Sequence, residues 1–205
     1  MLSAGLVDNA AASYAVKAWH YSRTLPVGPK VSVGFFENGA FIGVVIFSRG
    51  ASPNLLKPYG LTQSEGCELT RVALNDHIAP VTKIVKIALA LLKRKCPGLR
   101  LVVSFADSNQ GHLGTIYQAG NWVFSGLTNP KYEYHLNGRI YHDRQVSAKG
   151  YVKQFGKIVR VPTLDMCKKV ALPPKFRYLM PLDKKTRRAI IKMSKPYPKT
   201  LPSKH

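Results

Sequence analysis

The stretch Val102–Gly126, VVSFADSNQGHLGTIYQAGNWVFSG, holds the pattern that sets the fold of this chain. It begins with an apolar run, passes through a polar loop and a helix predicted over 111–120, and ends in a second apolar run at 121–126. A nearly continuous apolar run is typical of a strand that is covered on both faces. Ligands of such sheets bind beyond the carboxyl ends of the strands. The polar loop after Ala106 is therefore a candidate site.

Strand and helix patterns alternate on both sides of this stretch. The elements predicted there are helices over 8–19 and 80–95, a strand over 67–74, and two hairpins that turn at Asn38-Gly39 and Asn137-Gly138. Asn-Gly supplies the two positive φ angles of a type I′ turn, and the second hairpin places Tyr134 opposite Tyr141. The order α, β, β, β, α, β, α, β, β predicts an α/β fold, with a central mixed β-sheet and helices on both faces.

The positive charge of the chain is concentrated near its C-terminus. The formal net charge is +21, and residues 139–205 hold 18 of the 31 basic residues and three of the ten acidic ones. Beyond residue 150 the chain is rich in Pro and Lys, with a helical pattern at 182–194. We therefore expect a folded domain over 1–148 and a basic, partly disordered extension over 149–205. A charge excess of this size favours a polyanionic partner, and nucleic acid is the first candidate.

Cysteine usage and hydropathy indicate the compartment. Cys67, Cys96 and Cys167 are far apart and form no C-x-x-C pair, which fits a reducing cytoplasm better than a disulfide framework. No run approaches the roughly 18 apolar residues of a membrane span, and the N-terminus lacks a signal-peptide pattern. The sequence predicts a soluble cytoplasmic protein without membrane contact, and it does not specify an oligomeric state.

Charged side chains within the predicted strand 67–74 form a first candidate site. Alternation along the strand puts Glu68 and Thr70 on one face and Arg71 on the other. A charged pair on a strand of an apolar domain is unusual. Two interpretations stay open: Glu68 and Arg71 belong to a functional site, or they form a salt bridge at a sheet edge.

The loop that follows the next apolar strand forms a second candidate site. Its polar side chains are Asp107, Ser108, Asn109, Gln110 and His112. Helix capping and turn chemistry account for one or two of them, not for all five. We therefore interpret the loop as functional, with Ser104 on the strand before it and Tyr117 on the helix after it. Turn chemistry is the alternative.

His20 lies at the end of the predicted helix 8–19, where the helix dipole favours a histidine without any further role. One histidine does not make a metal site. A His, a Tyr and an Asp that meet in space can hold iron, and His20, Tyr117 and Asp107 are the candidates.

Several motifs, in order, resemble the Mom family of bacteriophage DNA-modification proteins, whose fold is similar to that of GNAT acyltransferases. These motifs are WHYSR, FENGAFIGVVIFSRG, CELTRVAL and the stretch Val102–Gly126, and they lie between Trp19 and Asp143. The resemblance implies an enzyme that converts adenine in double-stranded DNA to N6-(carbamoylmethyl)adenine. It also implies a phage-encoded protein of the host cytoplasm that protects phage DNA from host restriction.

The resemblance further implies which residues act. Carried over by motif, they are His20, Arg71, Ser104, Asp107 and Tyr117, and Glu68 joins them as a catalytic candidate on the same strand as Arg71. An iron-linked mechanism is implied as a candidate, and the cofactor is otherwise unknown. GNAT enzymes bind the pyrophosphate of coenzyme A with a glycine-rich loop before their long helix. This chain has LNDHIAPVTK there, without a glycine, so acetyl-CoA is not expected to bind in that way.

Adenine N6 is paired within a duplex, so an enzyme of this kind has to extrude the base into a pocket. Tyr21, Tyr117 and Trp122 are available to stack on it, although core packing is the favoured interpretation of Trp122. The basic side chains expected to bind duplex DNA through its phosphates are Lys168, Lys169, Lys175, Arg177, Lys184, Lys185, Arg187, Arg188 and Lys192.

Two alternative functions stay open. One is a conventional acetyl-CoA-dependent N-acetyltransferase, and the glycine-free loop counts against it. The other is a non-catalytic, basic nucleic-acid-binding protein. The polar cluster of Arg71, Ser104, Asp107 and Tyr117 counts against that, because a pure binder has little reason to bury such a cluster.

Overall fold

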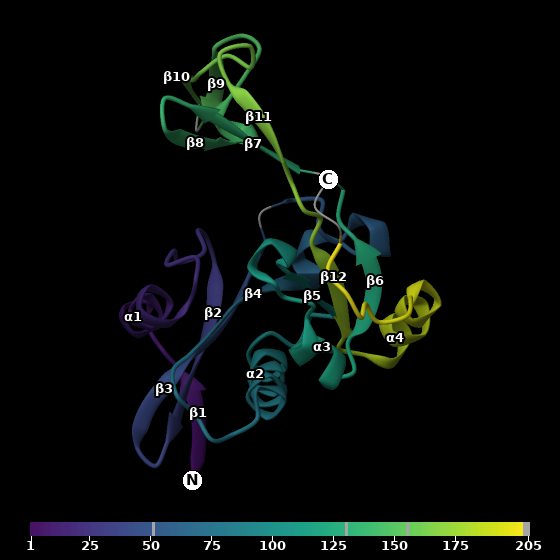
Figure 1. Ribbon diagram of the computed structural model, residues 1–205. Coiled ribbons are helices and arrows are strands. Elements are labelled where there is room, and N and C mark those ends of the chain that lie inside the picture. Colours follow the sequence, from purple (N-terminus) through teal and green to yellow (C-terminus); the bar gives the residue numbers. More distant parts are fainter. Residues whose placement is uncertain (51, 130, 155, 203–205) are drawn as a thin grey trace. The chain divides into compact units, whose positions relative to one another are not determined.

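The computed structural model describes residues 1–50, 52–129, 131–154 and 156–202 (Figure 1). These residues form two compact units, each of which is described by itself. The first unit comprises Met1–Ala106, Gly114–Gly126 and Arg177–Tyr197. The second unit comprises Asp107–Leu113, Leu127–Phe176 and the residues from Pro198 onward.

A seven-stranded mixed sheet forms the centre of the first unit. Its strands, in spatial order, are β1 (Leu2–Leu6), β2 (Lys30–Glu37), β3 (Ala40–Ser48), β4 (Gly66–Leu74), β5 (Leu101–Ala106), β12 (Phe176–Pro181) and β6 (Val123–Leu127). Strands β1 to β4 pair antiparallel with their neighbours, and β4 pairs parallel with β5. The predicted mixed α/β sheet is therefore confirmed.

Helices cover both faces of this sheet. They are α1 (Asn9–Trp19), α2 (Val81–Lys95), α3 (Thr115–Ala119) and α4 (Lys184–Ile190). The carboxylate of Asp8 caps α1, and Ala15 and Val16 of α1 pack against Val44 and Ile46 of β3. Successive side chains of a strand point to opposite faces. The other face of β3 is covered by α2, which lies across the sheet from α1 (Figure 1).

Both Asn-Gly turns have the geometry that the sequence predicts. The residues of the first turn, 38–39, have φ angles of 50° and 84°, and those of the second, 137–138, have 49° and 74°. In the second hairpin Tyr134 pairs with Tyr141. The register predicted for this hairpin from its turn type is therefore confirmed.

The helix predicted over 111–120 is shorter in the structure. A 3-10 turn, η3 (Ser108–Gln110), ends at Gly111, and α3 begins only at Thr115. Gly111 and Gly114 have φ angles of 73° and 80°, a left-handed conformation that interrupts a right-handed helix.

The C-terminal segment contains more regular structure than its composition suggested. Residues 149–205 include β9 (Tyr151–Gln154), β10 (Lys157–Arg160), β11 (Lys168–Leu172) and β12, in addition to α4. Because β12 lies between β5 and β6 in the main sheet, a boundary at residue 148 does not separate a domain from an appendage. β12 is short and mostly buried, and prolines lie at both of its ends. The sequence pattern therefore did not predict a strand there. Residues 203–205, the end of the tail predicted to be poorly ordered, lie outside the described residues.

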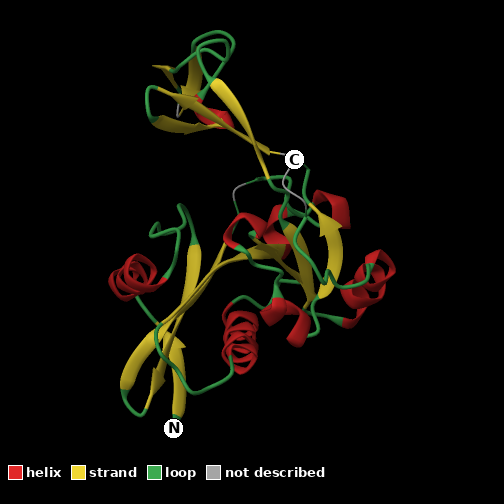
Figure 2. Cartoon of the chain, viewed as in Figure 1, coloured by secondary structure: helices red, strands yellow, loops and turns green. Residues whose placement is uncertain are grey.

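The second unit contains two small antiparallel sheets (Figure 2). β11, β7 (Lys131–Leu136) and β8 (Arg139–His142) form a three-stranded sheet in that order, and β9 and β10 form a two-stranded one. Further 3-10 turns in the chain are η1 (Lys57–Tyr59), η2 (Gln63–Glu65), η4 (Asp143–Gln145) and η5 (Ile191–Met193). Within the described ranges, no helix has the length and apolar character needed to cross a membrane.

Candidate active site

The candidate active site lies in the first unit, where the pairing of β4 and β5 ends. The two strands pair from Gly66 and Leu101 as far as Leu69 and Ser104. β4 then continues to Leu74, where it pairs with β3. Side chains from both strands and from α3 meet at this end of the pairing.

The hydroxyl group of Ser104 links the two strands to α3. Its Oγ lies 2.9 Å from the carbonyl oxygen of Leu69 and 2.8 Å from the hydroxyl oxygen of Tyr117. A hydroxyl has one proton and a carbonyl only accepts. When Ser104 donates to Leu69, Tyr117 therefore donates to Ser104. Ser104 is fully buried, and these two hydrogen bonds satisfy it.

Packing fixes the ring of Tyr117, and burial keeps its hydroxyl protonated. The ring centroids of Trp122 and Tyr178 lie 5.0 and 5.2 Å from that of Tyr117. Burial raises the pKa of Tyr117 to about 12. A Cβ on Gly114 would collide with the Tyr178 ring, so this position requires glycine. Trp122 is only 1% exposed, which confirms its core packing and removes it from the candidates for base stacking.

Arg71 ties β4 to the loop that follows α1. Its Nε and Nη2 donate to the carbonyl oxygen of Thr24 at 3.1 and 3.0 Å, and its Nη1 donates to that of Thr70 at 2.7 Å. A β-bulge at Thr70 interrupts the alternation of β4 against β3. The prediction that Glu68 and Arg71 lie on opposite faces assumed regular alternation. Because the bulge lies between these two residues, that assumption does not hold here.

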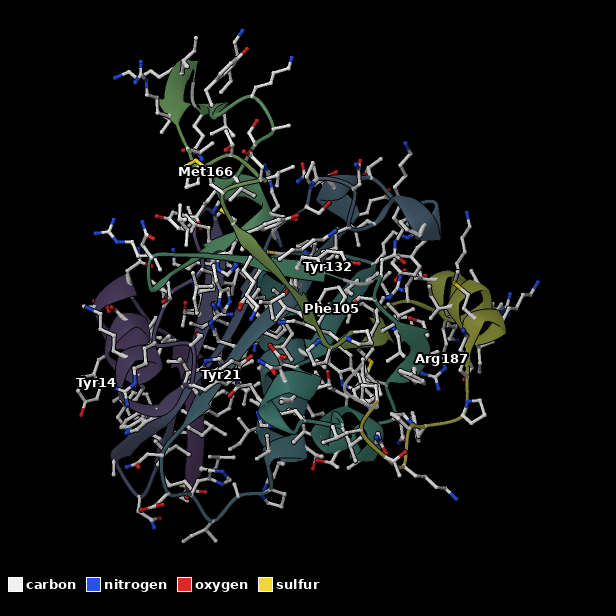
Figure 3. All side chains as sticks on the ribbon, turned by 45° about the horizontal axis from the view of Figure 1, so that its top comes forward. Tyr14, Tyr21, Phe105, Tyr132, Met166 and Arg187 are labelled. Carbon is white, nitrogen blue, oxygen red and sulfur yellow. The ribbon has the colours of Figure 1, made fainter. Side chains whose placement is uncertain are left out.

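Glu68 and Tyr21 act electrostatically on Tyr117 and Arg71. Burial lowers the pKa of Arg71, while the charges of Tyr21 and Glu68 raise it. The same two groups contribute to the raised pKa of Tyr117, after burial. The four side chains therefore share one electrostatic environment. Tyr21, labelled in Figure 3, is 53% exposed and can meet a ligand. The sequence predicted base stacking for Tyr21 but did not mark it as a site residue.

His20 lies beside Tyr21, and the two rings stack with centroids 4.3 Å apart. The N–H of Ser22 donates to Nδ1 of His20 at 3.1 Å, and the Ser22 hydroxyl lies 2.9 Å from the same atom. Because Nδ1 accepts a backbone N–H, it is the nitrogen without a proton.

Asp107 belongs to the second unit, whereas the other predicted catalytic residues belong to the first. Its Oδ1 accepts the Asn109 N–H at 3.1 Å, and its Oδ2 lies 2.5 Å from Nζ of Lys175. The Ser108 hydroxyl donates to the carbonyl oxygen of Pro174 at 2.7 Å. Turn chemistry and one ion pair thus occupy the polar groups at the start of this loop.

The predicted iron ligands already take part in hydrogen bonds or ion pairs with other residues of the chain. The atoms engaged in this way are Nδ1 of His20, both carboxylate oxygens of Asp107 and the hydroxyl of Tyr117. A buried phenol with a raised pKa also resists the deprotonation that metal ligation requires. Over the part of the chain that the structure describes, no three His, Cys, Asp or Glu side chains gather where they could hold a metal. Iron binding by these residues stays a prediction.

The loop before α2 does not fit the pyrophosphate of acetyl-CoA. Its Ile78 and Ala79 N–H groups donate to the carboxylate of Glu37 at 2.8 and 2.7 Å. These hydrogen bonds, the one from Ile78 most, lower the pKa of Glu37. A carboxylate of the chain itself thus occupies backbone donors that a phosphate would use. Glu37 could not be predicted from a local pattern, because 41 residues separate it from Ile78.

The basic side chains predicted to bind DNA fall into both units. Lys168, Lys169 and Lys175 lie in the second unit, and Arg177, Lys184, Lys185, Arg187, Arg188 and Lys192 lie in the first. Lys175 pairs with Asp107, and Nζ of Lys169 lies 3.8 Å from the centre of the Tyr132 ring. The four basic side chains of α4 are exposed. These residues are therefore not one contiguous basic tail.

A groove of about 550 Å³ lies beside α2 and α3 in the first unit. Lys83, Lys86, Ile116 and Trp122 are among the residues that line it. None of the predicted catalytic residues lines this groove. We therefore assign the groove no part in the chemistry of the residues around Tyr117.

Comparisons with known proteins agree with the resemblance seen in the motifs. A model of the Mom protein family matches residues 2–199. Methylcarbamoylase mom of Escherichia phage Mu is 30% identical over 194 residues, which cover 90% of this chain and 78% of that protein. Two solved structures are also similar. The IAA acetyltransferase from Bacillus cereus ATCC 14579 is 11% identical with a TM-score of 0.45, over 89% of this chain and 100% of that one. A putative phosphinothricin N-acetyltransferase is 12% identical with a TM-score of 0.47, over 90% and 100%. Because the family model spans nearly the whole sequence, this chain belongs to the Mom protein family.

Proposed function

We propose that this chain is a DNA-modifying enzyme that transfers a carbamoylmethyl group to N6 of adenine in double-stranded DNA. The observation that carries the proposal is the family match over residues 2–199, together with a relative that is named a methylcarbamoylase. The net charge of +21 supports a polyanionic substrate. Protection of phage DNA from restriction, in the cytoplasm of the host, is the biological role that such an activity serves.

The transfer replaces one N6–H bond of adenine by a bond from N6 to the methylene carbon of the incoming group. The bond between that carbon and its donor breaks, and the leaving group keeps the electron pair. N6 gives up one proton. The site therefore has to accept a proton near N6 and supply one to the leaving group.

Two side chains of the first unit suit these tasks. Tyr117 is protonated at neutral pH, and burial raises its pKa further, to about 12, so it is assigned the proton for the leaving group. Glu68, whose charge acts on both Tyr117 and Arg71, is assigned the proton from N6. Ser104 orients the Tyr117 hydroxyl. The exposed ring of Tyr21 is suited to stack on the extruded base.

Mass spectrometry of nucleosides from DNA of cells that express the protein tests this function. We expect a modified deoxyadenosine whose mass gain matches carbamoylmethyl. DNA from cells that do not express the protein is the control. A gain that matches acetyl instead would favour the acetyltransferase alternative, and unmodified nucleosides from cells rich in soluble protein would contradict the proposal.

A further inference from the structure

We infer that a two-stranded ribbon of the second unit, residues 147–154 and 156–162, binds duplex DNA and turns one of its faces toward the base edges in a groove. We call this segment the β9–β10 ribbon. The inference rests on the proposed function, because it names the element that holds the same DNA substrate. The basic residues singled out from the sequence begin at Lys168, after this ribbon.

Backbone hydrogen bonds define the ribbon. β9 pairs antiparallel with β10 along all four residues of each strand. Beyond the strands, the Val161 N–H donates to the Gly150 carbonyl oxygen at 2.9 Å, and the Ser147 N–H donates to that of Pro162 at 3.1 Å. A two-stranded ribbon is only marginally stable in water by itself. A partner that covers it would add stability.

The charge of the ribbon selects a polyanion as that partner. The sequence from Gln145 to Leu164 contains no Asp and no Glu. Its cations are Lys149, Lys153, Lys157 and Arg160, and all four are exposed. Four like charges on so short an element repel one another, and phosphates relieve that repulsion by neutralising them, while counterions are released from the DNA.

The register of the ribbon places a mixed set of side chains on one face. Tyr151 pairs with Arg160 and Lys153 pairs with Ile158, so these four side chains share a face. Ile158 is 66% exposed and Tyr151 is 43% exposed. Cations on such a face can contact phosphates while the apolar side chains contact bases, including the methyl group of thymine. Val159 belongs to the opposite face.

The size of the ribbon matches a groove of DNA. The major groove of B-DNA is about 12 Å wide and admits a two-stranded β-ribbon. At about 3.3 Å per residue, the five residues from Gly150 to Gln154 span roughly 16 Å. That length corresponds to about five phosphates of one strand at about 3.4 Å each. An anionic membrane surface would attract the same cations but has no base edges for the apolar side chains to read.

Neutralising the ribbon tests the electrostatic part of the inference. In Lys153→Gln/Arg160→Gln, the slope of log K against log salt for a fluorescent duplex should become shallower by about 1.8, because two phosphate contacts are lost at about 0.9 each. The control Lys17→Gln/Lys57→Gln removes the same charge from exposed lysines of the first unit and should leave the slope unchanged. Equal slopes for the ribbon variant and the wild type would overturn the inference. So would charge-dependent binding to phosphatidylserine vesicles without binding to the duplex.

A second pair of variants tests the choice of face. Ile158→Ser should weaken duplex binding severalfold at every salt concentration, with the slope unchanged, because it removes an uncharged contact. Val159→Ser, on the opposite face, should bind as the wild type does. Equal binding by both variants at the wild-type level would show that this face does not meet the bases.

Nucleoside mass spectrometry on cells that express the same variants separates this inference from the proposed function. If the wild type modifies adenine while the ribbon variants bind and modify as it does, the ribbon inference fails and the function stands. If the wild type leaves adenine unmodified while the ribbon variants show the shallower slope, the function fails and the DNA-binding ribbon stands.

Discussion

The hydroxyl and the ring of Tyr117 have separate tasks. The hydroxyl shares a hydrogen bond with that of Ser104, and the ring packs against Trp122 and Tyr178. Tyr117→Phe keeps the ring and deletes the hydroxyl. We expect this variant to lose about 1 kcal/mol of unfolding free energy, since a single hydrogen bond contributes about that much, and to leave adenine unmodified. Denaturant unfolding and nucleoside mass spectrometry at matched protein levels measure the two effects.

Tyr178→Phe is the matched control for this change. It deletes a hydroxyl that accepts from Nε2 of Gln118 at 3.1 Å and keeps a neighbouring ring of the same kind. We expect this control to modify adenine as the wild type does. Wild-type modification by Tyr117→Phe, or an equal loss in both variants, would show that Tyr117 acts through packing.

Asp107 combines a cap with a charge, and two substitutions separate these contributions. Asp107→Asn keeps an oxygen for the Asn109 N–H, because Asn caps about as well as Asp, but it removes the negative charge. We expect it to fold and to leave adenine unmodified, as the role predicted for Asp107 requires. Lys175→Met removes the partner of the ion pair and at most one predicted phosphate contact, so it should retain modification at saturating DNA. The same residual activity in both variants would reduce Asp107 to the structural role of holding Lys175.

The sequence located several members of the site but not the partners that hold them. Ser104 and Tyr117 were predicted because both border one polar loop after a buried strand, and local patterns reveal such neighbours. Thr24, which accepts from Arg71, lies 47 residues away from it, and Lys175 lies 68 residues from Asp107. No local pattern signals contacts of this kind. They follow from the tertiary fold.

At the scale of elements, the loop before α2 leads to a prediction about acetyl-CoA binding. Glu37 already accepts the N–H groups of Ile78 and Ala79. Titration of the wild type with acetyl-CoA in a calorimeter should therefore give no saturable heat. Glu37→Ala frees these two donors and should bind the nucleotide measurably, if weakly. Binding to the wild type as tight as that of a conventional acetyltransferase would contradict this view of the loop.

Arg100 joins η2 to the beginning of α4. Its Nη1 lies 2.9 Å from Oε1 of Glu65, and its Nε lies 3.3 Å from Oδ2 of Asp183. The Thr62 N–H lowers the pKa of Glu65 to about 2, with a further contribution from Arg100. The Thr186 N–H lowers the pKa of Asp183 to about 2 in the same way. Both carboxylates are thus better stabilised in the folded chain than in the unfolded one.

The sign of the pH dependence follows from these lowered pKa values. The stabilisation is present above the ordinary values of 4.5 and 3.8 and is lost as the pH falls toward about 2. We expect the free energy of unfolding, measured with denaturant at a series of pH values, to decline over this range. Arg100→Gln should make the decline smaller but not abolish it, since the backbone hydrogen bonds persist. Arg94→Gln, at an exposed arginine of α2, is the control, and a decline of equal size in both variants would show that Arg100 contributes nothing.

For the whole molecule, the main difference between sequence and structure concerns the C-terminal third. The hairpins around Asn38 and Asn137 were predictable because two residues define their turns. β12 was not, because its burial depends on β5 and β6, which precede it by many residues. A strand that joins an existing sheet from far along the chain has little local signature. Composition therefore predicted a separate extension, whereas this segment completes the sheet.

This difference changes what a truncation measures. Removing residues from Lys175 onward takes away not only basic charge but also β12 from between β5 and β6, and with it Leu179 and Ile190 from the core around Leu101. We expect a chain that ends at Pro174 to lose cooperative thermal unfolding, so any loss of DNA binding in it reflects loss of the fold.

A chain that ends at Lys199 keeps these elements and also the hydrogen bond from the Tyr197 hydroxyl to the Trp122 carbonyl oxygen at 2.7 Å. It should unfold cooperatively near the wild-type temperature, because the described residues that it lacks, 200–202, belong to no strand of the sheet. Calorimetry and far-UV circular dichroism on the two truncated chains compare them directly. Cooperative unfolding of the shorter chain would mean that the sheet closes without β12, and the C-terminal third would then be the separable extension that its composition suggests.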